Sequence, residues 1–145
     1  MTKQKDFTYP LMENCPQLIR PVTGRSMSEL TLESVLSGKL DAEDGRISSE
    51  TLQMQAEVAE THGYRQVAGS LRRASELVNV PDTLVLETYN MMRPYRADEE
   101  ELLAIADQYE TEFTAPLNAA FIREAAQVLK ERKLQKRDRG TGDRA

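Results

Sequence analysis

Apolar residues recur three and four positions apart from Thr31 onward, which is the spacing of one face of an α-helix. The pattern predicts a short helix over 31–37 that a glycine ends, and at most one further turn over 41–45. A longer helix is expected over 48–62, capped by one of the two serines at its start and ended by Gly63. The apolar faces of the first and the last of these helices are formed by Leu32, Val35 and Leu36, and by Leu52, Ala56 and Ala59.

The same spacing predicts four more helices, over 64–78, 81–93, 98–113 and 114–133. Pro81 suits a first helical turn, Pro94 ends a helix, and Thr114 is expected to cap the last one. The apolar stripes expected on these helices are Val67, Leu71, Ala74 and Val78; Val85, Tyr89 and Met92; Leu102, Ile105, Ala106, Tyr109 and Phe113; and Leu117, Phe121, Ala125 and Val128.

No segment alternates apolar and polar residues as a half-buried strand does. We therefore expect an all-α fold, a compact multi-helix domain with an irregular N-terminal arm over 1–30, where three prolines interrupt regular pairing. Such an arm lies either over the helical body or over another chain. The helical domain is expected over 31–135 and a basic, disordered tail over 136–145. A chain of 145 residues suffices for one domain with one core.

Charge is distributed unevenly, because residues 129–145 carry a net +4 and the first 128 residues carry −9. A basic tail can bind nucleic acid by releasing counterions from the phosphates. This tail has no aromatic residue to stack on bases, and its cations also suit the negative end of the last helix. We therefore expect a solvated helix end, on a body whose acidity repels phosphates.

The sequence also indicates a cellular compartment. No stretch approaches the roughly 20 apolar residues needed to cross a bilayer, and the N-terminus lacks the apolar core of a secretory signal. Cys15 is the only cysteine, so no internal disulfide can form, which favours a reducing cytoplasm. Cys15 is far in sequence from His62, and we expect an ordinary surface or packing thiol rather than a nucleophile.

Residue patterns that would carry catalysis are missing from the sequence. It contains no GxxxxGK[ST] phosphate loop and no GxGxxG, and one His with one Cys cannot build an ordinary zinc site. The consecutive Glu99, Glu100 and Glu101 point in different directions on a helix and are expected to form a solvated first turn. His62 is expected to cap a helix end or to be solvated. Pairs among the 24 acids stay open, but we predict no catalytic, cofactor-binding or metal-binding residue.

One segment has the composition of a protein interface. Residues 89–96, YNMMRPYR, place two Tyr, two Met and two Arg around a proline, and these residue types are enriched at interfaces. We predict a partner interface at Tyr89, Arg93, Tyr95 and Arg96. The alternative is that Tyr89 and Met92 belong to the core while both arginines are solvated. Arg72 and Arg73 are a weaker candidate of the same kind.

Seven segments match a known family in order and spacing. They are YPL at 9–11, TLESVLSG at 31–38, RISSETLQMQA at 46–56, RRASEL at 72–77, VPDTLVLETYNMMRPYR at 80–96, ELLAIAD at 101–107 and NAAFIREAA at 118–126. Through them the chain resembles the small (gamma) subunit of the adenosylcobalamin-dependent diol and glycerol dehydratases, from about residue 9 to about 135. The block at 80–107 is the most specific part of the resemblance.

The resemblance implies a non-catalytic small subunit of an enzyme that dehydrates glycerol or 1,2-propanediol to an aldehyde. The family's enzyme is a dimer of heterotrimers of large, medium and small subunits. Adenosylcobalamin lies between the large and medium subunits, and the small subunit packs on the outside of the large one. No catalytic residue of the family belongs to the small subunit, so none carries over to this chain.

Several alternatives stay open. A free-standing helical adaptor or nucleic-acid-binding protein would use the basic C-terminal tail, and a self-sufficient small enzyme would need a pocket with convergent polar groups. The short segment before residues 9–11 resembles the glycerol-dehydratase type, but substrate choice resides in the large subunit. The expected location is the cytoplasm, with a bacterial microcompartment as the alternative.

Overall fold

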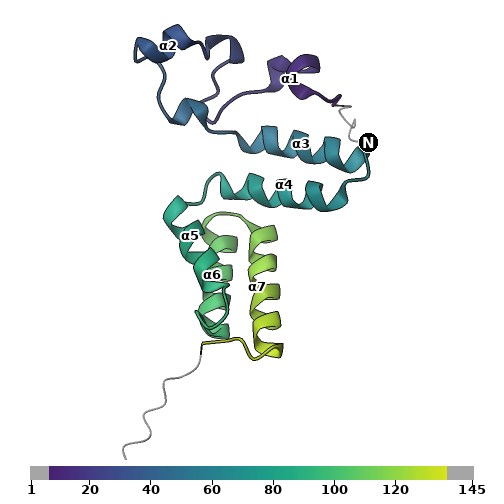
Figure 1. Cartoon of the computed structure of the whole chain (residues 1–145), viewed down its shortest axis with the longest axis vertical. Coiled ribbons are helices and arrows are strands. Elements are labelled where there is room, and N and C mark those ends of the chain that lie inside the picture. The colour runs from purple at the N-terminus through teal and green to yellow at the C-terminus, as the bar shows by residue number, and fades with distance from the viewer. Residues whose placement is uncertain (1–6, 137–145) are drawn as a thin grey trace, which may run out of the picture. The chain divides into compact units, whose positions relative to one another are not determined.

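The regular structure of this chain is helical. The computed structural model describes residues 7–136, and in that range it contains no named strand, only an isolated antiparallel bridge between Pro21 and Ile47. The helices are α1 (Leu11–Asn14), α2 (Leu32–Leu36), α3 (Ser49–Thr61), α4 (Arg65–Leu77), α5 (Asp82–Met91), α6 (Glu99–Glu112) and α7 (Pro116–Glu131) (Figure 1). Short 3-10 turns lie at Pro16–Leu18, Met27–Glu29 and Glu43–Gly45. The all-α prediction is confirmed; the tail expected over 136–145 lies, except for Lys136, outside the described residues.

The chain divides into two compact units, with the boundary between Val78 and Asn79. Each unit is built around one helical hairpin: α3 packs against α4 in the first unit, and α6 packs against α7 in the second. The boundary falls inside the range 31–135, and the hydrophobic pattern of the sequence does not predict it. The single helical domain expected over 31–135 stays a prediction.

The ends of α3 follow from two local signals. The Ser48 side chain caps the helix, since its Oγ accepts a hydrogen bond from the backbone N–H of Thr51 at 3.2 Å. At the other end Gly63 adopts φ +82°, and the N–H of Tyr64 reaches back to the carbonyl of Ala59 at 2.8 Å. The helix limits predicted from these residues are confirmed.

The N-terminal arm packs against the helical body. Leu11 is buried against Met54 and Val58 of α3, and Phe7, Leu18 and Ile19 pack around this cluster. Of the two positions expected for the arm, the structure therefore shows the one over the helical body for residues 7–19.

The start and the buried face of α6 agree with the sequence prediction. Asp98 caps the helix and forms a capping box with Glu101, each side chain bonding the other residue's backbone N–H at 2.9–3.0 Å. Leu102 and Tyr109 are buried, and the Tyr109 ring meets the Phe113 ring edge to face at 6.2 Å between centroids. This helix supplies the largest side chains of the second core.

The predicted stripe of α7 is wrong by one position. Its buried residues are Asn118, Ala119, Ile122, Ala126 and Leu129. Leu117 and Phe121 of the predicted stripe are exposed instead. Thr114 does not cap the helix either: the N-cap is Ala115, and Pro116 takes the first helical position, where its missing N–H costs nothing.

The other two helices also bury small residues and expose large ones. In α4 the buried positions are Ala68 and Ser75, while Val67 is exposed; in α5 Thr88 is buried and Tyr89 is exposed. The residues that are at most 1% exposed are mainly alanines: Ala56, Ala68, Ala97, Ala106, Ala115, Ala119 and Ala126, together with Leu102. Small side chains let helix backbones approach closely. Several large apolar residues, among them Val67, Leu86 and Tyr89, are left at the surface.

Candidate partner interface

Groups with recognisable chemistry are already engaged locally. His62 lies at the C-terminal end of α3, and its Nδ1 is 2.8 Å from the carbonyl oxygen of Val58, which the ring N–H can bond. This agrees with the capping role expected from the sequence. Cys15 is partly buried at the end of α1. Among residues 7–136 no group of three or more His, Cys, Asp or Glu side chains is placed to hold a metal ion.

The glutamates at the start of α6 join that helix to the end of α7. Lys130 Nζ donates to Glu99 at 2.7 Å, and Lys136 Nζ donates to Glu101 at 2.9 Å. The hydrogen bond from Lys136 lowers the pKa of Glu101, and the backbone bond from Asp98 adds to this. The acidic run is therefore a helix start with ion pairs, on the surface of the second unit.

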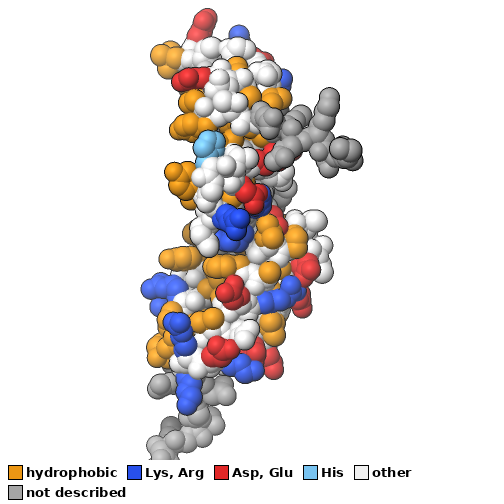
Figure 2. Space-filling model, turned by 90° about the vertical axis from the view of Figure 1, so that its right-hand side faces the viewer, with side chains coloured by type: hydrophobic (Ala, Val, Ile, Leu, Met, Phe, Trp, Pro, Cys, Tyr) orange, Lys and Arg blue, Asp and Glu red, His pale blue; other side chains and the backbone are white. Residues whose placement is uncertain are grey.

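Large apolar side chains reach the surface of both units (Figure 2). The most exposed ones lie on α2, where Leu32 is 74% and Leu36 is 79% accessible and Val35 is also exposed. The predicted face of this short helix therefore exists, and its three apolar side chains are largely exposed. Within residues 7–136 no helix is both long enough and apolar enough to span a membrane.

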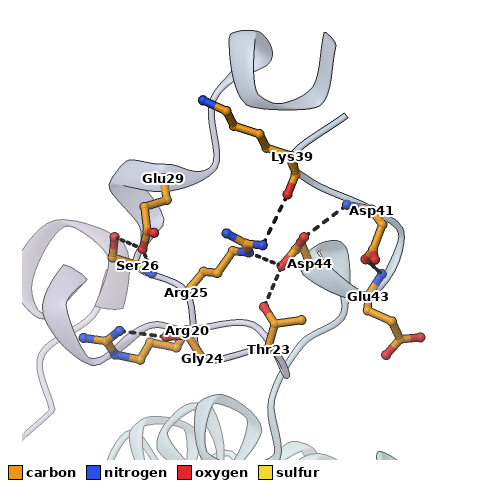
Figure 3. A network of polar contacts seen from close by, with 10 residues as sticks. All are labelled: Arg20, Thr23, Gly24, Arg25, Ser26, Glu29, Lys39, Asp41, Glu43 and Asp44. Carbon is orange, nitrogen blue, oxygen red and sulfur yellow. Dashed lines mark hydrogen bonds and ion pairs between the residues drawn. The ribbon is translucent and has the colours of Figure 1, made fainter. Parts of the chain in front are cut away.

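The loop that presents α2 is fixed at its base by a buried carboxylate. Asp44 accepts hydrogen bonds from Thr23 Oγ1 and Arg25 Nε, both at 2.7 Å, and from the backbone N–H of Asp41 at 3.1 Å (Figure 3). Arg25 also donates to the carbonyl of Lys39 at 3.2 Å. These bonds tie the two limbs of the loop together. The sequence marked Asp44 only as a turn residue, because nothing local predicts its partners.

Replacing Asp44 with Asn should change how stability depends on pH. The bonds from Thr23, and then from Asp41, lower the pKa of Asp44 below its ordinary value near 4. A carboxyl with a lowered folded pKa stabilises the fold above its unfolded pKa, and this contribution is lost as pH falls through the folded pKa. We expect Asp44→Asn to unfold at a lower temperature than the unaltered chain at pH 7, and the gap to narrow as pH falls below about 4.

Circular dichroism melts over this pH range would measure the effect. Glu57→Gln is the matched control, because Glu57 is exposed on α3 and removing its charge should leave the melting curves almost unchanged. Melting temperatures of Asp44→Asn and the unaltered chain that stay equally far apart at every pH would contradict the role given to the Asp44 charge.

A groove of about 540 Å³ lies between α1, α3 and α4 in the first unit. Its wall is almost wholly apolar, with Gln55 and His62 as the polar contributions. The residues that line it are Tyr9, Pro10, Leu11, Met12, Gln55, Val58, Ala59, His62, Tyr64, Val67 and Leu71. An apolar groove with few convergent polar groups suits contact with another chain better than it suits a reaction.

All four residues predicted as a partner interface are at the surface of the second unit. Tyr89 is 66% exposed, Tyr95 is about half exposed, and Arg93 and Arg96 are exposed. The alternative that places Tyr89 in the core is therefore wrong. Tyr95 has φ +64°, and its N–H donates to the carbonyl of Leu134 at 2.7 Å. Whether these residues meet a partner stays a prediction.

The weaker candidates, Arg72 and Arg73, have partners on their own unit. Arg72 forms an ion pair with Glu60, which joins α4 to α3 and lowers the pKa of Glu60. Arg73 Nη2 donates to Ser70 Oγ at 3.2 Å. These contacts give Arg72 a role within the hairpin that the sequence did not indicate.

Comparison with known proteins identifies the family. The family model described as "Dehydratase small subunit" matches residues 3–136. The propanediol dehydratase small subunit of Citrobacter freundii is 46% identical over 130 residues, which are 90% of this chain and 76% of that protein. The protein of the same description from Salmonella typhimurium strain LT2 is 47% identical over 130 residues, covering 90% and 75% of the two chains. This chain belongs to the dehydratase small subunit family.

Proposed function

We propose that this chain is the non-catalytic small subunit of a dehydratase that converts a 1,2-diol to an aldehyde and water, and that it works by packing on the large subunit. The observation that carries the proposal is the identity of 46–47% with two propanediol dehydratase small subunits over 90% of the chain. At that identity and coverage the relatives and this chain share their place in an enzyme as well as their fold.

The distribution of side chains supports a subunit role. Large apolar residues are exposed in both units, notably on α2, on α5 and along the groove of the first unit. A stable interface between proteins commonly buries about 1,600 Å² in total and needs apolar and aromatic anchors for it. We propose Tyr89, Arg93, Tyr95 and Arg96 as part of this interface.

The adenosylcobalamin of the assembled enzyme is proposed to be held by other subunits. The mostly apolar groove does not fit such a large, amide-rich cofactor, and the His62 imidazole bonds its own helix. The proposed assembly contains large and medium subunits as a dimer of heterotrimers. Its proposed location is the cytoplasm, with a microcompartment as the alternative.

Co-expression with the large and medium subunits of its own enzyme tests this function. We expect a three-chain assembly that dehydrates 1,2-propanediol or glycerol when adenosylcobalamin is added, and no turnover by this chain alone. Preparations of the large and medium subunits without this chain should be less active or less stable. Turnover by the isolated chain would refute the proposal, and so would an enzyme that is equally active and stable without it.

A further inference from the structure

The end of α7 lies beside the segment that follows α5 in the second unit. The N–H of Tyr95 donates to the carbonyl of Leu134 at 2.7 Å, and the N–H of Lys136 donates to the carbonyl of Ala97 at 2.9 Å. These two bonds hold residues 95–97 alongside residues 134–136. They bring Arg93 and Arg96 into the neighbourhood of Arg132 and Lys133. We call Arg93, Tyr95, Arg96, Arg132 and Lys133 the cationic platform.

Two residues of the platform have a costly backbone conformation. Tyr95 has φ +64° and Lys133 has φ +56°, and among the described non-glycine residues only Thr114 shares this region. Lys133 occupies the position after the α7 C-cap that glycine usually takes, with its N–H bonded to the carbonyl of Lys130 at 3.0 Å. The left-handed conformation costs a non-glycine residue roughly 1 kcal/mol or more. A lysine and a tyrosine at these positions therefore supply side chains that local stability alone does not favour.

The cations of the platform lack acidic partners among the described residues. Arg93, Arg96, Arg132 and Lys133 are exposed, and none of them forms an ion pair with a residue in 7–136. At the nearest helix start Glu99 and Glu101 pair with Lys130 and Lys136, Asp98 caps the helix, and Glu100 is exposed. The platform consequently presents positive charge around a half-exposed tyrosine, on a chain whose net charge is −5.

We propose that the cationic platform docks onto an acidic surface of a partner subunit of the same dehydratase. Guanidinium groups bind carboxylates with two parallel hydrogen bonds, and Tyr and Arg are the residues that most often dominate binding energy at interfaces. The inference rests on the proposed function and adds the chemistry of the partner surface. A nucleic acid fits less well, because Tyr95 is the one aromatic ring that the platform offers for stacking on bases.

The test is assembly of the full chain with the large and medium subunits, measured as a dissociation constant by native mass spectrometry and gel filtration. Arg93→Glu with Arg96→Glu should weaken association at least about 10-fold and flatten its dependence on salt between about 0.05 and 0.3 M NaCl. The charge-matched control, Lys39→Glu with Arg65→Glu, changes two exposed cations of the first unit and should stay within about twofold. The dissociation constant of the chain with Arg93→Lys and Arg96→Lys should lie between those of the charge-reversed chain and the control. This variant keeps the charge and loses the paired hydrogen bonds.

Circular dichroism should show that the charge-reversed chain keeps its helicity, since both arginines are exposed. Equal binding by the reversed and unaltered chains overturns the inference and leaves the proposed function standing. An unaltered chain that associates with neither subunit at low salt refutes the proposed function and the inference with it. A contrary outcome is that the unaltered chain binds a short DNA duplex. If charge reversal abolishes that binding and spares assembly, the platform is a nucleic-acid site and the inference is wrong.

Discussion

Tyr109→Ala should lower the free energy of unfolding of the second unit by about 3–5 kcal/mol, the usual cost of removing a buried aromatic side chain. Tyr109 is 2% exposed, lies on the inner face of α6 and contacts Phe113 edge to face. The change removes apolar burial and leaves a cavity that neighbouring helices fill only in part. Small domains have total stabilities of only about 5–15 kcal/mol, so the variant should be close to unfolded at 37 °C.

Tyr89→Ala is the matched control, because the same residue type on another helix of the same unit is 66% exposed. Its effect on unfolding should stay within about 0.5 kcal/mol. Urea denaturation of the purified chain, followed by circular dichroism, measures both variants. In assembly with the dehydratase subunits Tyr89→Ala should weaken association although it leaves folding almost unchanged, because it removes a proposed anchor. Equal destabilisation of folding by both changes would contradict the division of this unit into a buried and a partner-facing side.

Helix limits could be predicted from the sequence because the signals that set them are local. Ser48, Gly63 and Asp98 act on backbone groups within a few residues, so their effect does not depend on the rest of the fold. The irregular arm expected over 1–30 was likewise visible as a break in periodicity. What it would pack against was not, since Leu11 meets α3 only through the tertiary fold.

The buried faces of α4, α5 and α7 could not be predicted in the same way. In α7 the stripe through Leu117 and Phe121 and the stripe through Ala119 and Ile122 have the same helical spacing. The larger residues make the first stripe look like the core, but closeness of α6 and α7 favours the second one. A sequence that must also satisfy a partner carries apolar residues on two faces, and periodicity alone cannot say which face is internal.

The composition of residues 89–96 predicted part of the candidate interface. The more distant residues that lie beside this segment could not be predicted from the sequence. The Tyr, Met and Arg content of residues 89–96 indicated an exposed recognition segment, and Tyr89 and Tyr95 are indeed at the surface. That Arg132 and Lys133 lie in the same neighbourhood depends on two backbone hydrogen bonds between distant segments. The anchoring of the α2 loop by Asp44 depends on Thr23 and Arg25 in the same way.

Ala119→Leu should destabilise the second unit by about 1–3 kcal/mol, the usual cost of adding methylene groups to a packed core. Ala119 is fully buried on the face of α7 that belongs to the core. Leucine and alanine have nearly the same helix propensity, so the cost measures packing rather than helix formation. The second unit should respond through splaying of α6 and α7, because Ala119 has no exposed surface toward which a leucine side chain could turn.

Ala120→Leu provides the control, since Ala120 is the next residue of the same helix and is exposed. It should change the free energy of unfolding by no more than about 0.5 kcal/mol. Paired urea denaturation curves of the two variants measure the difference directly. If both substitutions change the free energy of unfolding equally little, α6 and α7 are not in close contact at Ala119. The argument that small residues let α6 and α7 pack closely would then lose its basis.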